Sequence, residues 1–301
     1  MIPAGQHGGD GARLAAALGI GADQVLDLSA SLNPVAPDPT PVLAAHLGAI
    51  GRYPAPEAAT AALSQAIGVS DGRLLLTNGG AEAIALVAAE LGPGWVEEPD
   101  FSLYRRHLPS LDPQGPVWRS NPHNPSGLLA AATAAAGVWD EAFWPLATGT
   151  WTRGDTATGA VVLGSLTKLL ACPGLRIGYV LAPPDLVDRL ARRQPRWSVN
   201  GLACSALPDL LATVDLATWS KETARLREQL VTVLHHHGLA AAPSDANWVL
   251  VVAPDLRDEL ARQAILVRDC ASFGLPGTVR IAVPTEDGLD RLGEALTRCR
   301  G

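Results

Sequence analysis

The sequence predicts an α/β protein with a mainly parallel sheet covered by helices and a smaller second domain. Three observations predict this fold: short apolar runs alternate with helical patterns, polar motifs follow several of these runs, and the texture changes after residue 183. A chain of 301 residues can bury one large core and a smaller one. Its hydrophobic content of 48% is that of a globular protein.

The strands expected in the larger domain are short and apolar. They cover residues 73–77, 94–98, 138–140, 160–166 and 175–181. Alternation of such runs with helices is typical of a mainly parallel sheet. Ligands of these sheets bind at the carboxyl ends of the strands, so the polar residues that follow the runs are the candidate site residues.

A smaller α+β domain is expected after residue 183, where the sequence pattern changes from alternating strands and helices to mostly helical. Residues 185–237 are mostly helical in pattern, residues 247–252, 265–269 and 278–283 are expected strands, and a helix follows near the end. The proline-rich segment 34–41 is expected to link an N-terminal arm to the large domain. We therefore expect an arm over residues 1–40 that is part of the small domain, a large domain over 41–195 and the small domain over 196–301.

Composition excludes several classes of function. The net charge is −7 and no basic cluster is interleaved with aromatic residues, so we expect no nucleic-acid surface. The start of the chain has no basic segment followed by an apolar one, and no window of 18 residues is wholly apolar, so we expect a cytoplasmic protein without membrane contact. The cysteines at 172, 204, 270 and 299 form no Cys-x-x-Cys pair, which favours free thiols and argues against a metal site.

The strongest candidate for chemistry is Lys168, in Ser-Leu-Thr-Lys at 165–168. A lysine can form a Schiff base with a carbonyl compound, while Ser165, Thr167 and Arg176 can hydrogen-bond one phosphate group. An aldehyde cofactor that carries a phosphate fits this set, which indicates pyridoxal 5′-phosphate. The alternative is that Lys168 is only a solvated charge at the end of a buried strand.

Three further motifs follow expected strands. Gly80 and Ala81, in Thr-Asn-Gly-Gly-Ala-Glu at 77–82, can offer backbone N–H groups to a phosphate at a helix start, or form an ordinary turn. Asn-Pro-His-Asn-Pro-Ser-Gly at 121–127 fixes a rigid turn that leaves the Asn124 amide for a ligand oxygen. Asp140 can keep a pyridine nitrogen protonated, or simply cap the next segment.

Matches to one family run along the whole chain. Besides the motifs above they are His-Gly-Gly at 7–9, Leu-Asp-Leu-Ser-Ala-Ser-Leu-Asn-Pro at 26–34, Arg-Tyr-Pro at 52–54, Trp-Ser-Val-Asn at 197–200, Ala-Asn-Trp at 246–248, Ile-Leu-Val-Arg at 265–268 and Val-Arg-Ile-Ala at 279–282. The set resembles the fold-type I pyridoxal-phosphate enzymes of the class I/II aminotransferase family. The resemblance implies a three-layer transferase fold and pyridoxal 5′-phosphate as cofactor.

The resemblance also implies roles for the cofactor residues. Lys168 would bind the cofactor covalently and move protons at the substrate's alpha carbon. Asp140 would pair with the pyridine nitrogen, Asn124 with the ring hydroxyl, and Phe101 would stack on the ring. The phosphate would be held by a set of six residues: Gly80, Ala81, Ser165, Thr167, Arg176 and, from the partner subunit of a homodimer, Tyr53.

The substrate residues implied by the resemblance are two arginines and two residues of the N-terminal arm. Arg280 would bind the substrate carboxylate, and Arg268 the substrate phosphate, together with His7 and Asn33. Without the resemblance, each arginine would be interpreted as a surface charge at a strand end. The implied substrate is a small phosphorylated amino acid or amine.

Two departures from the family pattern are visible. Phe143 stands where many aminotransferases have a tyrosine that bonds the ring hydroxyl. Only twelve residues separate Gly127 from Asp140, and the stretch from Phe101 to Asn121 is also short. We therefore expect a shortened large domain that has lost surface helices, and a barer sheet edge that a partner subunit would cover.

The reaction itself is left open between three possibilities. We favour decarboxylation of L-threonine O-3-phosphate to aminopropanol phosphate in cobalamin biosynthesis, because His-Gly-Gly, Trp-Ser-Val-Asn and Phe143 match that branch of the family. The alternative is amino transfer to or from a phosphorylated substrate such as histidinol phosphate. A third possibility is a catalytically degenerate protein that still binds the cofactor.

Overall fold

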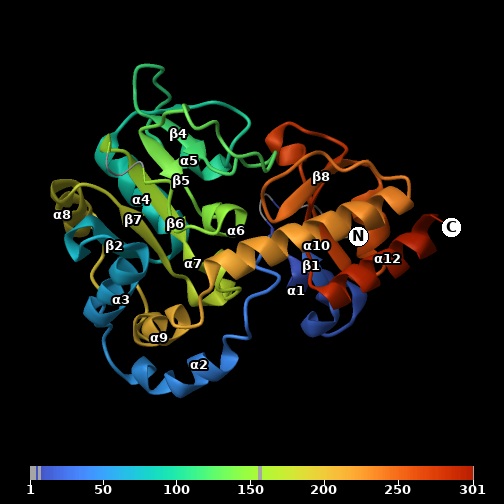
Figure 1. The fold of residues 1–301 in the computed structure, drawn as a ribbon, viewed down its shortest axis with the longest axis horizontal. Coiled ribbons are helices and arrows are strands. Elements are labelled where there is room, and N and C mark those ends of the chain that lie inside the picture. The colour runs from blue at the N-terminus through green and yellow to red at the C-terminus, as the bar shows by residue number, and fades with distance from the viewer. Residues whose placement is uncertain (1–4, 6–7, 155–157, 301) are drawn as a thin grey trace.

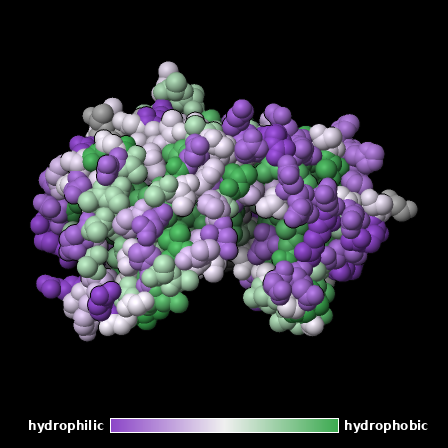
Figure 2. Space-filling view, turned by 60° about the horizontal axis from the view of Figure 1, so that its bottom comes forward, coloured by the Kyte–Doolittle hydropathy of each residue, from purple (hydrophilic) through white to green (hydrophobic). Residues whose placement is uncertain are grey.

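The computed structural model describes residues 5, 8–154 and 158–300. The chain forms two lobes, each built on its own sheet, and the N- and C-terminal parts lie together in the smaller lobe (Figure 1). The space-filling view shows a notch between the two lobes (Figure 2). The α/β class with a smaller second domain, predicted from the alternating pattern, is confirmed.

The larger lobe holds a six-stranded sheet in the order β2-β7-β6-β5-β4-β3. The strands are β2 (Leu74–Thr77), β3 (Trp95–Val96), β4 (Val117–Ser120), β5 (Val138–Asp140), β6 (Val161–Ser165) and β7 (Gly178–Leu181). Strands β3 to β6 are parallel to one another, and β7 runs antiparallel to both of its neighbours. The carboxyl ends of β4, β5 and β6 therefore meet at one edge, where the predicted site residues follow.

Helices cover this sheet on both faces, which gives the three layers. One apolar cluster joins the sheet to α4 (Gly79–Leu91), α5 (Ser102–His107) and α8 (Pro184–Arg193). On the other face a second cluster joins it to α3 (Glu57–Ile67), α6 (Trp144–Thr148), α7 (Leu166–Leu169) and α9 (Gly201–Leu211). Helix α2 (Thr40–Ala45) packs on α9 at the bottom of Figure 1.

The smaller lobe holds a four-stranded sheet in the order β1-β9-β10-β8. Its strands are β1 (Leu26–Leu28), β8 (Trp248–Val252), β9 (Ile265–Asp269) and β10 (Thr278–Ala282). The N-terminal arm belongs to this lobe because β1 pairs in parallel with β9. The helices of the lobe are α1 (Gly11–Leu18), α11 (Leu256–Ala261) and α12 (Glu286–Arg300).

Helix α10 (Leu216–His236) connects the two cores. Leu216 and Trp219 pack in the core of the larger sheet, whereas Leu226, Leu230 and Leu234 pack in the core of the smaller one. Figure 1 shows α10 running from one lobe to the other. The sequence placed the domain boundary at residue 195, before α9; the packing of α9 and of the start of α10 leads us to propose a boundary within α10.

The connection between β4 and β5 lacks a crossover helix in the structure. Residues 128–137 form an irregular loop, and its alanines at 130, 134 and 136 pack against the core that contains Trp139. Arg153 stacks over the Trp139 ring at 4.6 Å and donates hydrogen bonds to the carbonyl oxygens of Ala132 and Ala134, each at 2.8 Å. This loop and arginine cover the part of the sheet that the shortened chain leaves without a helix.

The β3 edge of the sheet is covered by the chain itself. Asp112 donates its backbone N–H to the Gly94 carbonyl at 2.9 Å, and Gly94 forms an isolated parallel bridge with Leu111. The sequence analysis expected a partner subunit to cover a bare edge. At this edge the segment around Leu111 already occupies the position next to β3.

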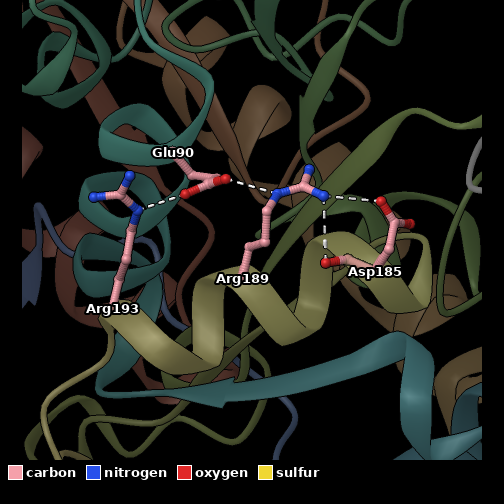
Figure 3. Close-up of polar contacts among 4 residues, drawn as sticks. All are labelled: Glu90, Asp185, Arg189 and Arg193. Carbon is pink, nitrogen blue, oxygen red and sulfur yellow. Dashed lines mark hydrogen bonds and ion pairs between the residues drawn. The ribbon is translucent and has the colours of Figure 1, made fainter.

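An ion network ties two helices together on the outside of the larger lobe (Figure 3). Glu90 on α4 accepts from Arg189 at 2.7 Å and from Arg193 at 2.5 Å, both on α8, and Arg189 also contacts Asp185 at 2.9 Å. The two arginines hold the pKa of Glu90 below its usual range. The network fixes α8 against α4 at the surface.

Within the described part of the chain, no single helix has both the length and the apolar character that crossing a bilayer requires. Helices α9 and α10 meet that test only when taken together, and the chain bends by 89° between them.

Candidate active site

A cavity of about 290 Å³ lies where the strand ends of the larger sheet face the smaller lobe. Eleven of the residues singled out from the sequence line it: Gly80, Ala81, Phe101, Asn124, Asp140, Ser165, Thr167, Lys168, Arg176, Arg268 and Arg280. These residues come from both lobes and span 200 positions of the sequence. The fold thus brings together most of the set that the motifs predicted.

Lys168 supplies the one amine of this cavity. It lies in α7, which begins directly after β6, and its Nζ donates to the Ala30 carbonyl oxygen at 2.8 Å. Burial, together with the nearby charges of Arg280 and Arg176, lowers the pKa of Lys168 to about 8. The chain has only one other lysine, Lys221, which is exposed on α10. A buried amine with a lowered pKa is a usable nucleophile and proton carrier.

Hydroxyl, guanidinium and backbone groups form a cup beside Lys168. Ser165 and Thr167 lie 2.8 Å apart through their hydroxyl oxygens, and Arg176 has a left-handed backbone with φ of 55°. A Cβ at Gly79 would lie 2.5 Å from the Arg176 guanidinium. Because Gly79 has no side chain, Arg176 and the start of α4 lie next to each other and can bind one anion.

Asp140 ends β5 and faces the cavity. Its Oδ2 accepts from the Tyr104 hydroxyl at 2.8 Å and its Oδ1 from the Ala142 backbone N–H at 3.0 Å. Burial raises the pKa of Asp140 to about 6. Tyr104, which is fully buried, was not predicted from the sequence; its position three residues after Phe101, in the first turn of a short helix, was the available signal.

A buried polar network fixes Phe101 and Asn124. The Asp100 carboxylate accepts from the Phe101 backbone N–H at 2.7 Å and from the Ser120 hydroxyl at 2.5 Å, and the Ser120 oxygen accepts from the Asn124 N–H at 2.7 Å. Asp100 and Ser120 were not predicted. A carboxylate beside the aromatic residue and a serine that ends β4 are ordinary in sequence, and only the pairing of distant segments reveals their role.

Two buried arginines stand at the side of the cavity formed by the smaller lobe. Arg280 on β10 and Arg268 on β9 are register partners on antiparallel strands, with exposures of 7% and 5%. Arg280 donates to the Asn124 side-chain oxygen at 2.8 Å and stacks over Trp248 at 4.9 Å. Burial lowers the pKa of Arg280 to about 10.

Arg268 reaches the N-terminal arm and the turn after β9. It donates to the Gly5 carbonyl oxygen and, at 2.8 Å, to the Ser272 hydroxyl. Burial lowers its pKa as well. Two buried guanidinium groups side by side at one cavity suit the binding of anions.

Two described residues singled out from the sequence, Tyr53 and Asn33, are not among the cavity residues. Tyr53 is 78% exposed and stacks on Trp197 with ring centroids 4.5 Å apart. Asn33 is buried, but its amide donates to the Leu169 carbonyl at 2.9 Å and its backbone N–H to the Lys168 carbonyl at 3.0 Å. Asn33 therefore supports the helix that carries Lys168 rather than facing a ligand. His7 lies outside the described residues.

Phe143 lines the cavity and offers it no hydrogen-bonding group. Its ring packs edge-on against Trp248, with centroids 4.7 Å apart and an interplanar angle of 75°. The Asn124 amide therefore remains as the side chain that can bond a ring hydroxyl near this position. The departure noted in the sequence thus lies within the cavity itself.

The chemistry of the cavity fits pyridoxal 5′-phosphate. An amine, a carboxylate at a strand end and an anion cup are arranged around one space whose volume is at the lower end of the range for small-molecule pockets, about 300 to 1,000 Å³. A Cβ at Gly178 would lie 2.7 Å from the Gly79 backbone, so the strand end and the start of α4 approach more closely than side chains allow. That approach leaves backbone N–H groups open to a phosphate.

The fold and the cavity together define a pyridoxal-phosphate enzyme of the aminotransferase type. The model of the family described as aminotransferase class I and II matches residues 97–296. The chain belongs to this family. Its cofactor is pyridoxal 5′-phosphate, and it is either an aminotransferase or a lyase related to threonine-phosphate decarboxylase.

Curated relatives carry both activities in their names. The chain is 31% identical to the threonine-phosphate decarboxylase of Salmonella typhimurium over 357 aligned positions, which cover 96% of this chain and 95% of that protein. It is 27% identical to histidinol-phosphate aminotransferase 1 of Dechloromonas aromatica, with 95% and 92% covered. An alignment of 357 positions exceeds the 301 residues of this chain, so the chain is shortened internally, as predicted.

The solved structures agree on the fold. The histidinol-phosphate aminotransferase of Sinorhizobium meliloti, determined in complex with pyridoxal-5′-phosphate, superposes with a TM-score of 0.81 at 19% identity. The match covers 96% of this chain and 94% of that one. The fold-type I architecture predicted from the motifs is confirmed despite the shortening.

Proposed function

We propose that the protein decarboxylates L-threonine O-3-phosphate to aminopropanol phosphate, a reaction of cobalamin biosynthesis. The observation that carries this proposal is the pair of buried guanidinium groups, Arg280 and Arg268, in register on adjacent strands. A phosphorylated amino acid has two anionic groups, a carboxylate and a phosphate, which match these two cations. The 31% identity to a threonine-phosphate decarboxylase supports the same choice.

The residues of the cup hold the cofactor in this proposal. Ser165, Thr167, Arg176 and the backbone at Gly80 and Ala81 bind its phosphate. Asp140 pairs with the pyridine nitrogen, Asn124 with the ring hydroxyl, and Phe101 stacks on the ring. When bound, the cofactor supplies an electron sink next to the substrate's alpha carbon.

The remaining steps fall to residues of this chain. Arg280 binds the substrate carboxylate and Arg268 its phosphate, so the alpha carbon is held beside the Lys168 amine. The bond between the alpha carbon and the carboxylate carbon would then break and carbon dioxide would leave, with the bound cofactor supplying the sink for the electron pair of that bond. Lys168 then delivers one proton to the alpha carbon. A pKa lowered to about 8 lets this amine give up and regain a proton near neutral pH.

Phe143 supports decarboxylation over amino transfer. Amino transfer needs a second proton movement at the cofactor, and the tyrosine found at this place in many aminotransferases bonds the ring hydroxyl. Here the ring of Phe143 packs on Trp248 and leaves Asn124, which already accepts from Arg280, as the side chain near that hydroxyl.

Amino transfer on a phosphorylated substrate is the second candidate. Histidinol-phosphate aminotransferases align over most of this chain at 27% to 29% identity. The two arginines would then serve the phosphate of one substrate and the two carboxylates of a dicarboxylic partner substrate in turn. This candidate requires a keto acid as co-substrate.

A homodimer is part of the proposal. Leu47, Ile50, Tyr53 and Trp197 are exposed by 53%, 68%, 78% and 55%, and they lie on two segments that pack together, since a Cβ at Gly201 would meet the Ala49 carbonyl at 3.0 Å. Exposed apolar and aromatic side chains of this kind mark interaction surfaces. In a dimer formed through this surface, Tyr53 would reach the phosphate in the partner's site. Light scattering should give twice the chain mass, and Ile50→Glu should give the monomer.

The cysteines support the cytoplasm as the proposed location. All four are free, and Cys172, Cys204 and Cys270 are buried. Free buried thiols fit a reducing compartment.

One assay separates the two reactions. Purified protein with pyridoxal phosphate is given L-threonine O-3-phosphate without any keto acid, and carbon dioxide and aminopropanol phosphate are measured. We expect release without 2-oxoglutarate; a strict requirement for 2-oxoglutarate would exclude decarboxylation in favour of amino transfer. Arg268→Gln should raise KM for the phosphorylated substrate by about 100-fold or more. KM for unphosphorylated threonine should differ little between the variant and the wild type.

A further inference from the structure

We propose that Tyr104 is a positioning residue whose hydroxyl orients the Asp140 carboxylate and keeps it ionised, so that Asp140 can hold the pyridine nitrogen of the cofactor. The inference rests on the role proposed for Asp140 and goes beyond it. It concerns cofactor binding, so it holds for either of the two candidate reactions.

Tyr104 contacts both Asp140 and Phe101, the two residues proposed to bind the pyridine nitrogen and to stack on the ring. It has no exposed surface, and its ring packs edge-on against Phe101, with centroids 5.7 Å apart at 84°. Trp118 closes the other side at 5.8 Å. The phenol is thus wedged between β4 and the residue proposed to stack on the ring, and it has little freedom to turn its hydroxyl elsewhere.

The hydrogen bond from Tyr104 completes the support of the Asp140 carboxylate. One carboxylate oxygen accepts from Tyr104 at 2.8 Å and the other from the Ala142 N–H at 3.0 Å. The two donors fix the plane of the carboxylate from opposite sides. Tyr104 is the side-chain donor of this pair; the other donor belongs to the backbone and is present with any residue except proline at position 142.

The surroundings of Asp140 oppose its charge. Burial raises its pKa to about 6, and the Asp100 carboxylate, in the segment before α5, pushes it in the same direction. Tyr179 from β7 and Glu141 are the other titratable groups nearby: the charges of Glu141 and Asp140 both raise the pKa of Tyr179. Among the described residues, no cation is one of the groups that shift the pKa of Asp140, so its two hydrogen bonds carry the stabilisation of the ionised form.

Tyr104 is a donor at every working pH. Burial and the charges of Asp140 and Asp100 raise its pKa well above the usual value of about 10. The phenol therefore stays protonated, and its hydrogen always points to an acceptor. Removing the hydroxyl makes Asp140 harder to ionise, and a protonated Asp140 cannot accept the proton of the pyridine nitrogen.

The test is the affinity of the cofactor-free protein for pyridoxal phosphate, measured by titration between pH 6 and pH 9. We expect Tyr104→Phe to weaken binding about tenfold at pH 6.5 to 7, because a hydrogen bond to a charged group is lost. The affinity should recover as the pH rises and Asp140 ionises again. Tyr179→Phe is the matched control: this tyrosine is also buried in the sheet, and no hydrogen bond joins its hydroxyl to Asp140.

A second experiment, in the Asp140→Asn variant, distinguishes a positioning role of Tyr104 from a role in ring packing alone. In Asp140→Asn protein, the additional change Tyr104→Phe should weaken cofactor binding by less than about threefold, because the carboxylate through which Tyr104 acts is gone. A loss that is equal at every pH, or that persists undiminished in the Asp140→Asn background, would overturn the inference in favour of ring packing alone. None of these measurements uses substrate, so they are independent of the proposed decarboxylation.

Discussion

Two regions of the larger sheet differ in what the shortened chain has kept. One is the edge formed by the carboxyl ends of the strands, and the other is the flank between β4 and β5. At the strand ends, Lys168, Asp140 and Arg176 surround one cavity. At the flank, a loop and the side chain of Arg153 stand where a crossover helix is usual for parallel strands. The chain therefore retains its chemistry at one edge while its covering layer is reduced.

The comparison shows that function and stability depend on different residues of the same sheet. Burial opposes the charged forms of Lys168, Asp140 and Arg280, so these groups lower the stability of the free protein. Arg153 binds carbonyl groups and an indole ring and is not among the described residues that line the cavity. Variants at the strand ends should lose activity without loss of stability, and variants at the flank should do the reverse.

The largest expected effect is that of Lys168→Ala. Activity should fall by about a thousandfold or more, because both the covalent attachment and the proton carrier are removed. The melting temperature of the cofactor-free protein should not fall, since a buried amine with a lowered pKa disappears. Lys221→Ala, the only other lysine variant, should keep full activity; a cofactor trapped by borohydride reduction on Lys221 would contradict the assignment.

Asp140→Asn tests the strand ends through the pH dependence of the stability of the cofactor-free protein. The pKa of Asp140 is raised to about 6 in the folded state, above about 3.9 in the unfolded chain. Its contribution to stability is therefore fully present below about pH 3.9 and is lost as the pH rises through 6. Cofactor-free Asp140→Asn protein should thus gain about 2 kcal/mol over the wild type at pH 7.5 and nothing near pH 4.

Urea unfolding of the cofactor-free protein at the two pH values measures this difference. Asp188→Asn, at an exposed position on α8, is the control and should show no such gain. A gain of equal size at both pH values would mean that burial of the charge is not its cause.

Arg153→Ala tests the flank. The free energy of unfolding should fall by about 2 kcal/mol, because hydrogen bonds to two loop carbonyls and the stacking on Trp139 are lost together. The activity of the folded enzyme should stay within about twofold of the wild type. Arg298→Ala, an exposed arginine on α12, should change stability little. A large loss of kcat in a fully folded Arg153 variant would break the separation of the two regions.

The smallest effect is expected at the surface network of Figure 3. Arg193 and Arg189 lower the pKa of Glu90, so its contribution to stability is present above the ordinary glutamate pKa of about 4.3 and is lost as the pH falls through the lower folded value. Glu90→Gln should lower the melting temperature slightly at pH 7 and not at strongly acid pH. Because the network is exposed to solvent, high salt should reduce the difference; calorimetry at two salt concentrations measures it.

Much of the fold could be predicted because its strands are apolar runs with clear ends. The runs at 138–140 and 265–269 coincide with β5 and β9. Strands β1 and β4 were missed: each has only three or four residues with a charged one among them. What makes them strands is pairing with other segments, which for β1 lie more than 200 residues away. The boundary near residue 195 was placed by a change in texture, whereas α10 spans both cores.

The candidate site likewise contains some residues that could be predicted from the sequence and others that could not. Lys168, Arg176 and Asp140 follow strands directly, and their chemistry can be recognised from the order of residues alone. Tyr104, Asp100 and Ser120 could not be recognised, because a tyrosine or a serine becomes part of a site only when another segment brings its acceptor within 3 Å. Asn33 shows the converse: its side chain was expected at the substrate and is used by the backbone at Leu169.

By itself, the sequence determined the family, the cofactor and the shortened large domain, since these depend on which residues follow which strands and on how many residues lie between them. The tertiary structure decided which groups act together: that Arg280 and Arg268 are neighbours, that Tyr104 supports Asp140, and that Arg153 stands over Trp139. The physical reason is that hydrogen bonds and burial act over a few ångströms. Only the folded chain brings residues that are not neighbours in sequence to that distance.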